Sequence, residues 1–225
     1  ADLRNYVLNK SLRPATIPMT TRDLYIEQGL LRAAGRELMA GANPAWRNKH
    51  LSPGLVIGAG STLTNTGHRG LDALLLLDVV QPLGITELQL DPFGLISAAG
   101  AIATRNPEAV VHLMEGGNLI KLGTAFNLGG LVRQDRQAMK IEILLEHGEK
   151  VQHTLDGGHV WIYPLAANHT AQVTIRCASD TSINGRRGVK LTVSGGQVGL
   201  IFDARGRPLA LSDNARTRAA QMPNW

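Results

Sequence analysis

The chain has 225 residues, 44% of them apolar and 18% charged, which is ordinary for a globular protein of one large domain or two small ones. Aromatic residues make up only 4%, which argues against the stacking platforms that single-stranded nucleic-acid binders use. Because Cys177 is the single cysteine, the chain has no internal disulfide and no cysteine-cluster metal site, and a reducing, cytoplasmic setting is expected. No apolar run has the length of a transmembrane helix, so we expect no membrane partner.

The formal net charge of +5 is concentrated at one end of the chain. The segment from Thr181 to Trp225 holds seven basic and two acidic residues, so it accounts for the whole excess. A basic segment can bind phosphates or an acidic partner, or it can be a solvated face. The basic residues are scattered rather than clustered, which argues against nucleic-acid binding.

Helical and short strand patterns alternate up to about residue 135. Thr20 and Asp23 approximate a capping box, and Gly41 is a typical C-terminal glycine, so a helix is expected between Thr20 and Gly41. The following patterns predict, in chain order, a strand at 54–60, a helix at 70–80, a strand at 86–90, and helices at 95–104 and 107–114. This alternation is typical of an α/β domain, which we place at residues 1–135.

Strand patterns dominate the rest of the chain. Short β-branched runs separated by glycine turns predict strands at 140–145, 150–155, 159–163, 171–177, 189–193 and 198–202. A last helix is expected at 213–222. We therefore expect a mostly β domain, a small barrel or a sandwich with a terminal helix, over residues 136–225.

A glycine turn follows the strand predicted at 54–60. It is formed by Gly58, Ala59 and Gly60 and is followed by hydroxyl residues, namely Ser61, Thr62 and Thr64. Glycines allow the backbone to approach a flat ring or a phosphate, and the hydroxyls offer hydrogen-bond donors. The alternative is a plain chain reversal. The third glycine of the dinucleotide fingerprint and the lysine of the phosphate loop are both absent.

This turn resembles the adenosine motif of the actin, sugar-kinase and heat-shock-70 superfamily. Three longer segments are similar to the accessory protein of coenzyme B12-dependent glutamate mutase, which belongs to that superfamily: Arg13 to Leu38, Leu74 to Ala103, and Val193 to Leu211. The resemblance implies an actin-like, ribonuclease H-like subdomain before the β-rich domain. It also implies an ATPase-type reactivase or chaperone, with Gly58, Ala59, Gly60, Ser61, Thr62 and Thr64 at the base and ribose of ATP or ADP.

The chain also departs from that family. The first phosphate motif, which grips Mg²⁺ and the γ-phosphate, is absent, and no catalytic acid can be identified, so we expect no catalysis by this chain alone. Mg²⁺ would bind only if another segment completed the site. The family's pair of adjacent glycines is interrupted by Ala59, whose methyl group crowds the place of the base. We therefore expect a C-terminal portion of the family protein, whose partner is the N-terminal half of the ATPase or a B12-dependent mutase.

A second motif, Asp203, Arg205 and Arg207, follows the last predicted strand. Its arginines can contact a phosphate or the carboxylate of a partner, or the three residues can satisfy one another in a structural turn. Asp78 and Asp91 are each expected to be either a helix cap or a functional acid. The histidines show no paired ligand spacing, so no metal site is predicted.

Three functions remain open from the sequence. The first is an accessory chain that binds the adenosine side of a nucleotide and a protein partner. The second is a complete ATPase assembled from two chains. The third is a scaffolding module that has kept the fold and lost the nucleotide.

Overall fold

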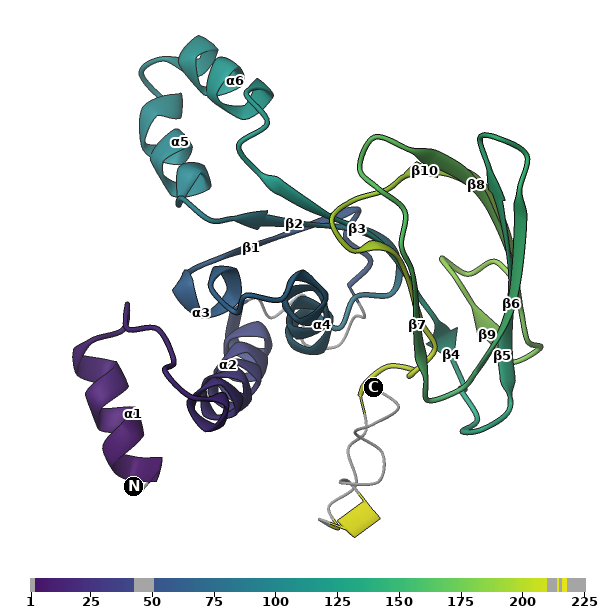
Figure 1. The fold of residues 1–225 in the computed structure, drawn as a ribbon, viewed down its shortest axis with the longest axis horizontal. Coiled ribbons are helices and arrows are strands. Elements are labelled where there is room, and N and C mark those ends of the chain that lie inside the picture. Colours follow the sequence, from purple (N-terminus) through teal and green to yellow (C-terminus); the bar gives the residue numbers. More distant parts are fainter. Residues whose placement is uncertain (1–2, 43–50, 210–213, 215, 218–225) are drawn as a thin grey trace. The chain divides into compact units, whose positions relative to one another are not determined.

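The structure is a computed structural model that describes residues 3–42, 51–209, 214 and 216–217. It is mixed α/β, as expected, with helices among the first strands and an unbroken series of strands from β3 to β11 (Figure 1). The helices are α1 (Leu3–Leu12), α2 (Thr21–Ala42), α3 (Ser61–Thr64), α4 (Arg69–Val80), α5 (Leu95–Ala103) and α6 (Pro107–Glu115). The strands are β1 (Leu55–Ala59), β2 (Gly84–Asp91), β3 (Ile120–Asn127), β4 (Gly129–Gly130), β5 (Gln137–Leu145), β6 (Lys150–Asp156), β7 (Val160–Tyr163), β8 (Thr170–Cys177), β9 (Thr181–Ser182), β10 (Gly188–Ser194) and β11 (Gly199–Asp203).

The strands form three sheets, and among the described residues none of them closes into a barrel. Five strands follow the order β1-β2-β3-β11-β7, in which β11 runs parallel to β3 and antiparallel to β7. Four strands form an antiparallel sheet in the order β10-β8-β5-β6. The short strands β4 and β9 pair with each other.

The chain divides into two compact units that alternate along the sequence. The first comprises Ala1–Asn48, Ile57–Val80 and Leu90–Ile120, and the second comprises Lys49–Val56, Gln81–Gln89 and Lys121–Trp225. The strands β1, β2 and β3 each pass from one unit to the other along the chain.

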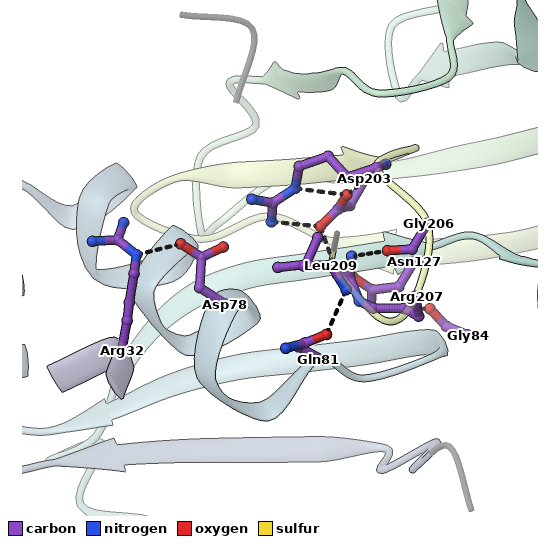
Figure 2. Close-up of polar contacts among 10 residues, drawn as sticks. Arg32, Asp78, Gln81, Gly84, Asn127, Asp203, Gly206, Arg207 and Leu209 are labelled. Carbon is purple, nitrogen blue, oxygen red and sulfur yellow. Dashed lines mark hydrogen bonds and ion pairs between the residues drawn. The ribbon is translucent and has the colours of Figure 1, made fainter. Parts of the chain in front are cut away.

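The first unit is built on the contact between α2 and α4. The N-terminus of α2 is capped by Thr20, whose side-chain oxygen accepts the N–H of Asp23 at 3.1 Å, so this part of the predicted capping box is confirmed. Gly35 allows a close approach, since a Cβ there would lie 2.5 Å from Cγ1 of Val79. The Arg32 Nε donates to Oδ2 of the buried Asp78 at 2.7 Å and ties the two helices together (Figure 2). No helix of the described chain is both long and apolar enough to cross a membrane.

The second unit has one hydrophobic core to which two sheets contribute. On β5, Ile141 and Ile143 point into this core while Lys140 and Glu142 face outward, as the two-residue period of a strand requires. The rings of Phe126 on β3 and Phe202 on β11 stack with their centroids 4.9 Å apart. The five-stranded and the four-stranded sheet therefore both contribute side chains to this core.

Most of the predicted elements are present, and the exceptions have physical reasons. The helix α1 was not predicted, because its apolar residues are spread around the helix and form no stripe on one face. The strand β3 was also missed because Gly123 interrupts its pattern. A Cβ at Gly123 would lie 1.9 Å from the carbonyl oxygen of Gly199, so the glycine serves the close β3–β11 pairing. The helix predicted at 213–222 lies mostly outside the described residues.

Candidate functional site

The glycine turn expected to bind adenosine follows directly after β1 (Figure 1). Gly60 is exposed and has φ 99° and ψ 148°, a backbone region that is essentially restricted to glycine. Ala59 is exposed as well. No heavy atom lies within 4 Å of the place where a Cβ of Gly60 would be, so its backbone face is open. Among the predicted residues, Ala59 and Gly60 are therefore the most accessible to a flat ligand.

Gly58 lies on the inner side of the same turn. It is buried, and a Cβ there would lie 2.7 Å from Cδ2 of Leu76 and 3.2 Å from Cδ2 of Leu90. Leu76 is on α4 and Leu90 is near the end of β2, so Gly58 allows β1 to pack closely beneath them. The requirement for glycine at this position is thus explained by packing.

The hydroxyl groups after the turn have different environments. The Thr64 hydroxyl is buried and donates to the carbonyl oxygen of Gly60 at 3.1 Å, so it stabilises the turn itself. Ser61 and Thr62 are half-buried at the start of α3. With only four residues, α3 adds little helix dipole, and the hydroxyls of Ser61 and Thr62 are the groups left for a ligand.

An ionic cluster around the buried Asp72, which the sequence analysis missed, holds the end of this turn. Asp72 is fully buried on α4, where it accepts a hydrogen bond from the Thr66 hydroxyl and an ion pair from Arg69 at 3.0 Å. Arg69 also donates to the carbonyl oxygen of Thr64 at 3.1 Å. An acidic residue in the first turn of a helix is a common stabilising feature, and that signal could have marked Asp72.

The structure distinguishes the two roles considered for Asp78 and Asp91. Asp78 forms the ion pair with Arg32, while Asp91 caps α5 by accepting the backbone N–H groups of Leu95 at 2.9 Å and Ile96 at 2.8 Å. Burial alone would raise the pKa of Asp91, but these backbone hydrogen bonds outweigh it and lower the pKa. Asp91 is therefore a charged cap of α5.

The second predicted motif forms a cluster at the end of β11 in the second unit (Figure 2). The Asp203 carboxylate accepts Nε of Arg205 at 3.0 Å and one terminal nitrogen each from Arg205 and Arg207 at 2.7 Å. Arg207 also donates to the carbonyl oxygen of Gly206 at 2.8 Å and contacts the Asn127 side-chain oxygen at 3.4 Å. The structure therefore brings all three predicted residues together.

This cluster is almost fully enclosed. The side chains of both arginines are 1% exposed and that of Asp203 is 0% exposed. Burial alone would raise the pKa of Asp203, but the charges and hydrogen bonds of Arg205 and Arg207 hold that pKa well below its usual range. Nε of Arg207 is buried and has no hydrogen-bond partner among the residues that the structure describes. One carboxylate thus faces two guanidinium groups, and in this structure none of the three is open to a partner.

Cys177 is buried on β8, and burial raises the pKa of its thiol. Within the described part of the chain, no group of three or more histidine, cysteine, aspartate or glutamate side chains is arranged to hold a metal ion. Comparison with protein-family models, with curated proteins and with solved structures finds no match to this chain.

Proposed function

We propose that this chain is the C-terminal part of an actin-like accessory protein of the glutamate-mutase type. In this role the turn Ala59–Gly60 contacts the base or ribose of a nucleotide. The observation that supports the proposal is the exposed backbone at Gly60, in a conformation that other residues avoid, directly after a sheet strand and beside two half-buried hydroxyl groups. Strand ends of this kind are frequent ligand sites in α/β folds.

The turn can account for binding of the adenosine part of a nucleotide, but not for binding of its phosphates. The charge that develops in phosphoryl transfer requires a metal clamp, and the described residues contain no cluster of acids to hold one. The chain would therefore serve as one side of a nucleotide site and depend on another segment or chain for the phosphate side. A protein partner, either the remaining half of the ATPase or a B12-dependent mutase, belongs to the same proposal.

A scaffolding module without nucleotide binding is the second candidate, and the role of Gly58 favours it. Gly58 is required for packing against Leu76 and Leu90, so the strand–glycine pattern has a structural cause that needs no ligand. Gly58 has the same packing role under both candidates. The candidates differ at Gly60, whose open backbone face is needed for nucleotide binding but not for a scaffolding module.

Calorimetric titration of the whole chain with adenosine distinguishes them. At about 0.3 kcal/mol per non-hydrogen atom, a ligand of this size reaches a Kd of roughly 0.1 mM. ATP and ADP should displace adenosine with affinities within about threefold of its own, with or without Mg²⁺, because their phosphates meet no clamp. If millimolar adenosine gives no binding heat, the scaffolding module is the remaining candidate.

Gly60→Ala and Gly148→Ala form a matched pair of variants. Both glycines are exposed, have positive φ (99° and 88°) and leave room for a Cβ, so each substitution strains the backbone without a steric clash. We expect Gly60→Ala to abolish adenosine binding and Gly148→Ala, in the β5–β6 hairpin, to preserve it. Equal loss in the two variants would mean that the turn is not the site.

A further inference from the structure

The outward face of the β10-β8-β5-β6 sheet carries an unusual set of charges. A groove of about 660 Å³ on this sheet is lined by polar side chains that include Lys140, Arg176 and Lys190. Lys140 on β5 lies directly opposite Arg176 on β8, so two cations occupy one cross-strand pair. Like charges in such a pair are destabilising, and natural sheets usually place opposite charges there.

The one carboxylate among the described groove residues is bound directly to other side chains. Glu142 accepts a hydrogen bond from Gln152 at 3.2 Å and forms an ion pair at 2.8 Å with Lys150, which is not part of the groove lining. The hydrogen bond from Lys150 is the main reason why the pKa of Glu142 is lowered, and the charge of Arg176 adds a smaller contribution. Lys140, Arg176 and Lys190 form no ion pair within 4.0 Å with any residue that the structure describes.

The spacing of the three cations suits an anion with several charges. Directly opposed Cβ atoms lie about 5 Å apart and diagonal neighbours about 7–8 Å apart, so Arg176 has Lys140 on one side and Lys190, opposite Thr174, on the other. Arg176 can bind phosphate oxygens bidentately, whereas the lysines act as point charges. Thr154 and Thr174 add hydroxyl donors in the same groove. A volume of about 660 Å³ is in the range of small-ligand sites.

We propose that this groove binds a compact oligophosphate, an anion of two or more linked phosphate groups, through Lys140, Arg176 and Lys190. A nucleic-acid strand fits less well, because His153 is the one ring among the described lining residues and it is stacked on Trp161 at 4.0 Å. The site lies wholly in the second unit, so it is independent of the turn at Gly60.

Titration of the whole chain with inorganic tripolyphosphate tests this site. We expect saturable binding that Arg176→Gln weakens about tenfold or more, since a charge-assisted, bidentate contact is lost. The control is Arg136→Gln, which removes the same charge from an exposed position of the second unit outside the groove lining and should leave binding unchanged. Gly60→Ala should also leave it unchanged, which separates this site from the proposed adenosine site.

Two results would overturn the proposal. One is equal affinity of the wild type, Arg176→Gln and Arg136→Gln for tripolyphosphate, or no binding by any of them. The other is a duplex DNA probe that binds through the same cations and excludes tripolyphosphate at equal phosphate concentration, because the face would then be a nucleic-acid surface. The unfolding midpoint of Arg176→Gln is measured as well. If it is at or above that of the wild type, a loss of binding by this variant does not come from a loss of folding.

Discussion

The cluster of Asp203, Arg205 and Arg207 makes a strong prediction about stability. Replacing Asp203 with asparagine keeps the shape of the side chain but removes the negative charge between two guanidinium groups that are each 1% exposed. Loss of one partner from a buried, hydrogen-bonded charge cluster leaves uncompensated charge and costs about 3–5 kcal/mol. We therefore expect Asp203→Asn to lower the free energy of unfolding of the second unit by about that amount.

The same unit provides a matched control at its surface. Arg133 and Asp180 form an ion pair of 2.9 Å, close to the 2.7 Å contacts of Asp203, but their side chains are 67% and 43% exposed. Solvent screening reduces such a pair to about 0–1 kcal/mol. Asp180→Asn should therefore have a small effect, although it removes the same charge from the same type of ion pair.

Urea unfolding followed by the fluorescence of Trp161 reports on the correct unit. Its ring centroid lies 5.3 Å from that of Phe202, the residue next to Asp203, and the other two tryptophans, Trp46 and Trp225, can be replaced by phenylalanine. A fall of 3 kcal/mol shifts the urea midpoint by roughly 1–3 M for an m-value of about 1–3 kcal/mol/M. Equal urea midpoints for Asp203→Asn and Asp180→Asn would refute the reasoning, because the contribution of an ion pair to the free energy of unfolding would then not depend on its burial.

Three further predictions follow from single contacts. Because the pKa of Asp203 is lowered in the folded state, its stabilisation should be complete at neutral pH and decline as the pH falls below about 4, so the difference in unfolding free energy between wild type and Asp203→Asn should shrink there. Asp91→Asn should weaken the cap of α5 by about 1 kcal/mol and speed amide hydrogen exchange at Leu95 and Ile96. Asn106→Ala, which removes the cap of α6, should speed amide exchange in α6 and leave α5 unchanged. Lys140→Gln should raise the free energy of unfolding by about 0.5 kcal/mol in urea titrations, because it removes a like-charge pair, and a loss of stability would contradict this.

The elements that the sequence predicted correctly are those with strong local signals. The capping pair of Thr20 and Asp23 marked the start of α2, and alternating β-branched residues marked β5 and β8. The central strand β3 has no such signal, because Gly123 is explained only by its partner Gly199, far along the chain. Sheet order depends on such long-range pairs, and a single sequence does not reveal them.

The candidate sites show the same limit. The sequence correctly placed a glycine turn after β1, yet it could not separate Gly58, which serves packing, from Gly60, which leaves an open backbone face. The groove on the four-stranded sheet was missed because its cations come from three strands and approach one another only through strand register. One of these cations, Lys190, belongs to the basic segment from Thr181 onward, whereas Lys140 and Arg176 precede that segment.

The motif of Asp203, Arg205 and Arg207 illustrates why residue type alone does not define an anion site. Asp203 is the last residue of β11 and the two arginines lie in the turn that follows it, so the turn brings the three side chains together whether or not a ligand is bound. Here the Asp203 carboxylate already occupies the position that a phosphate would take between the guanidinium groups, at 2.7 Å from each. An incoming phosphate would have to displace a buried carboxylate and leave it unpaired, at a cost of several kcal/mol. On the sheet face, Glu142 is the one carboxylate among the described groove residues; its side chain is 40% exposed and pairs with Lys150, so an incoming anion has no buried carboxylate to displace there.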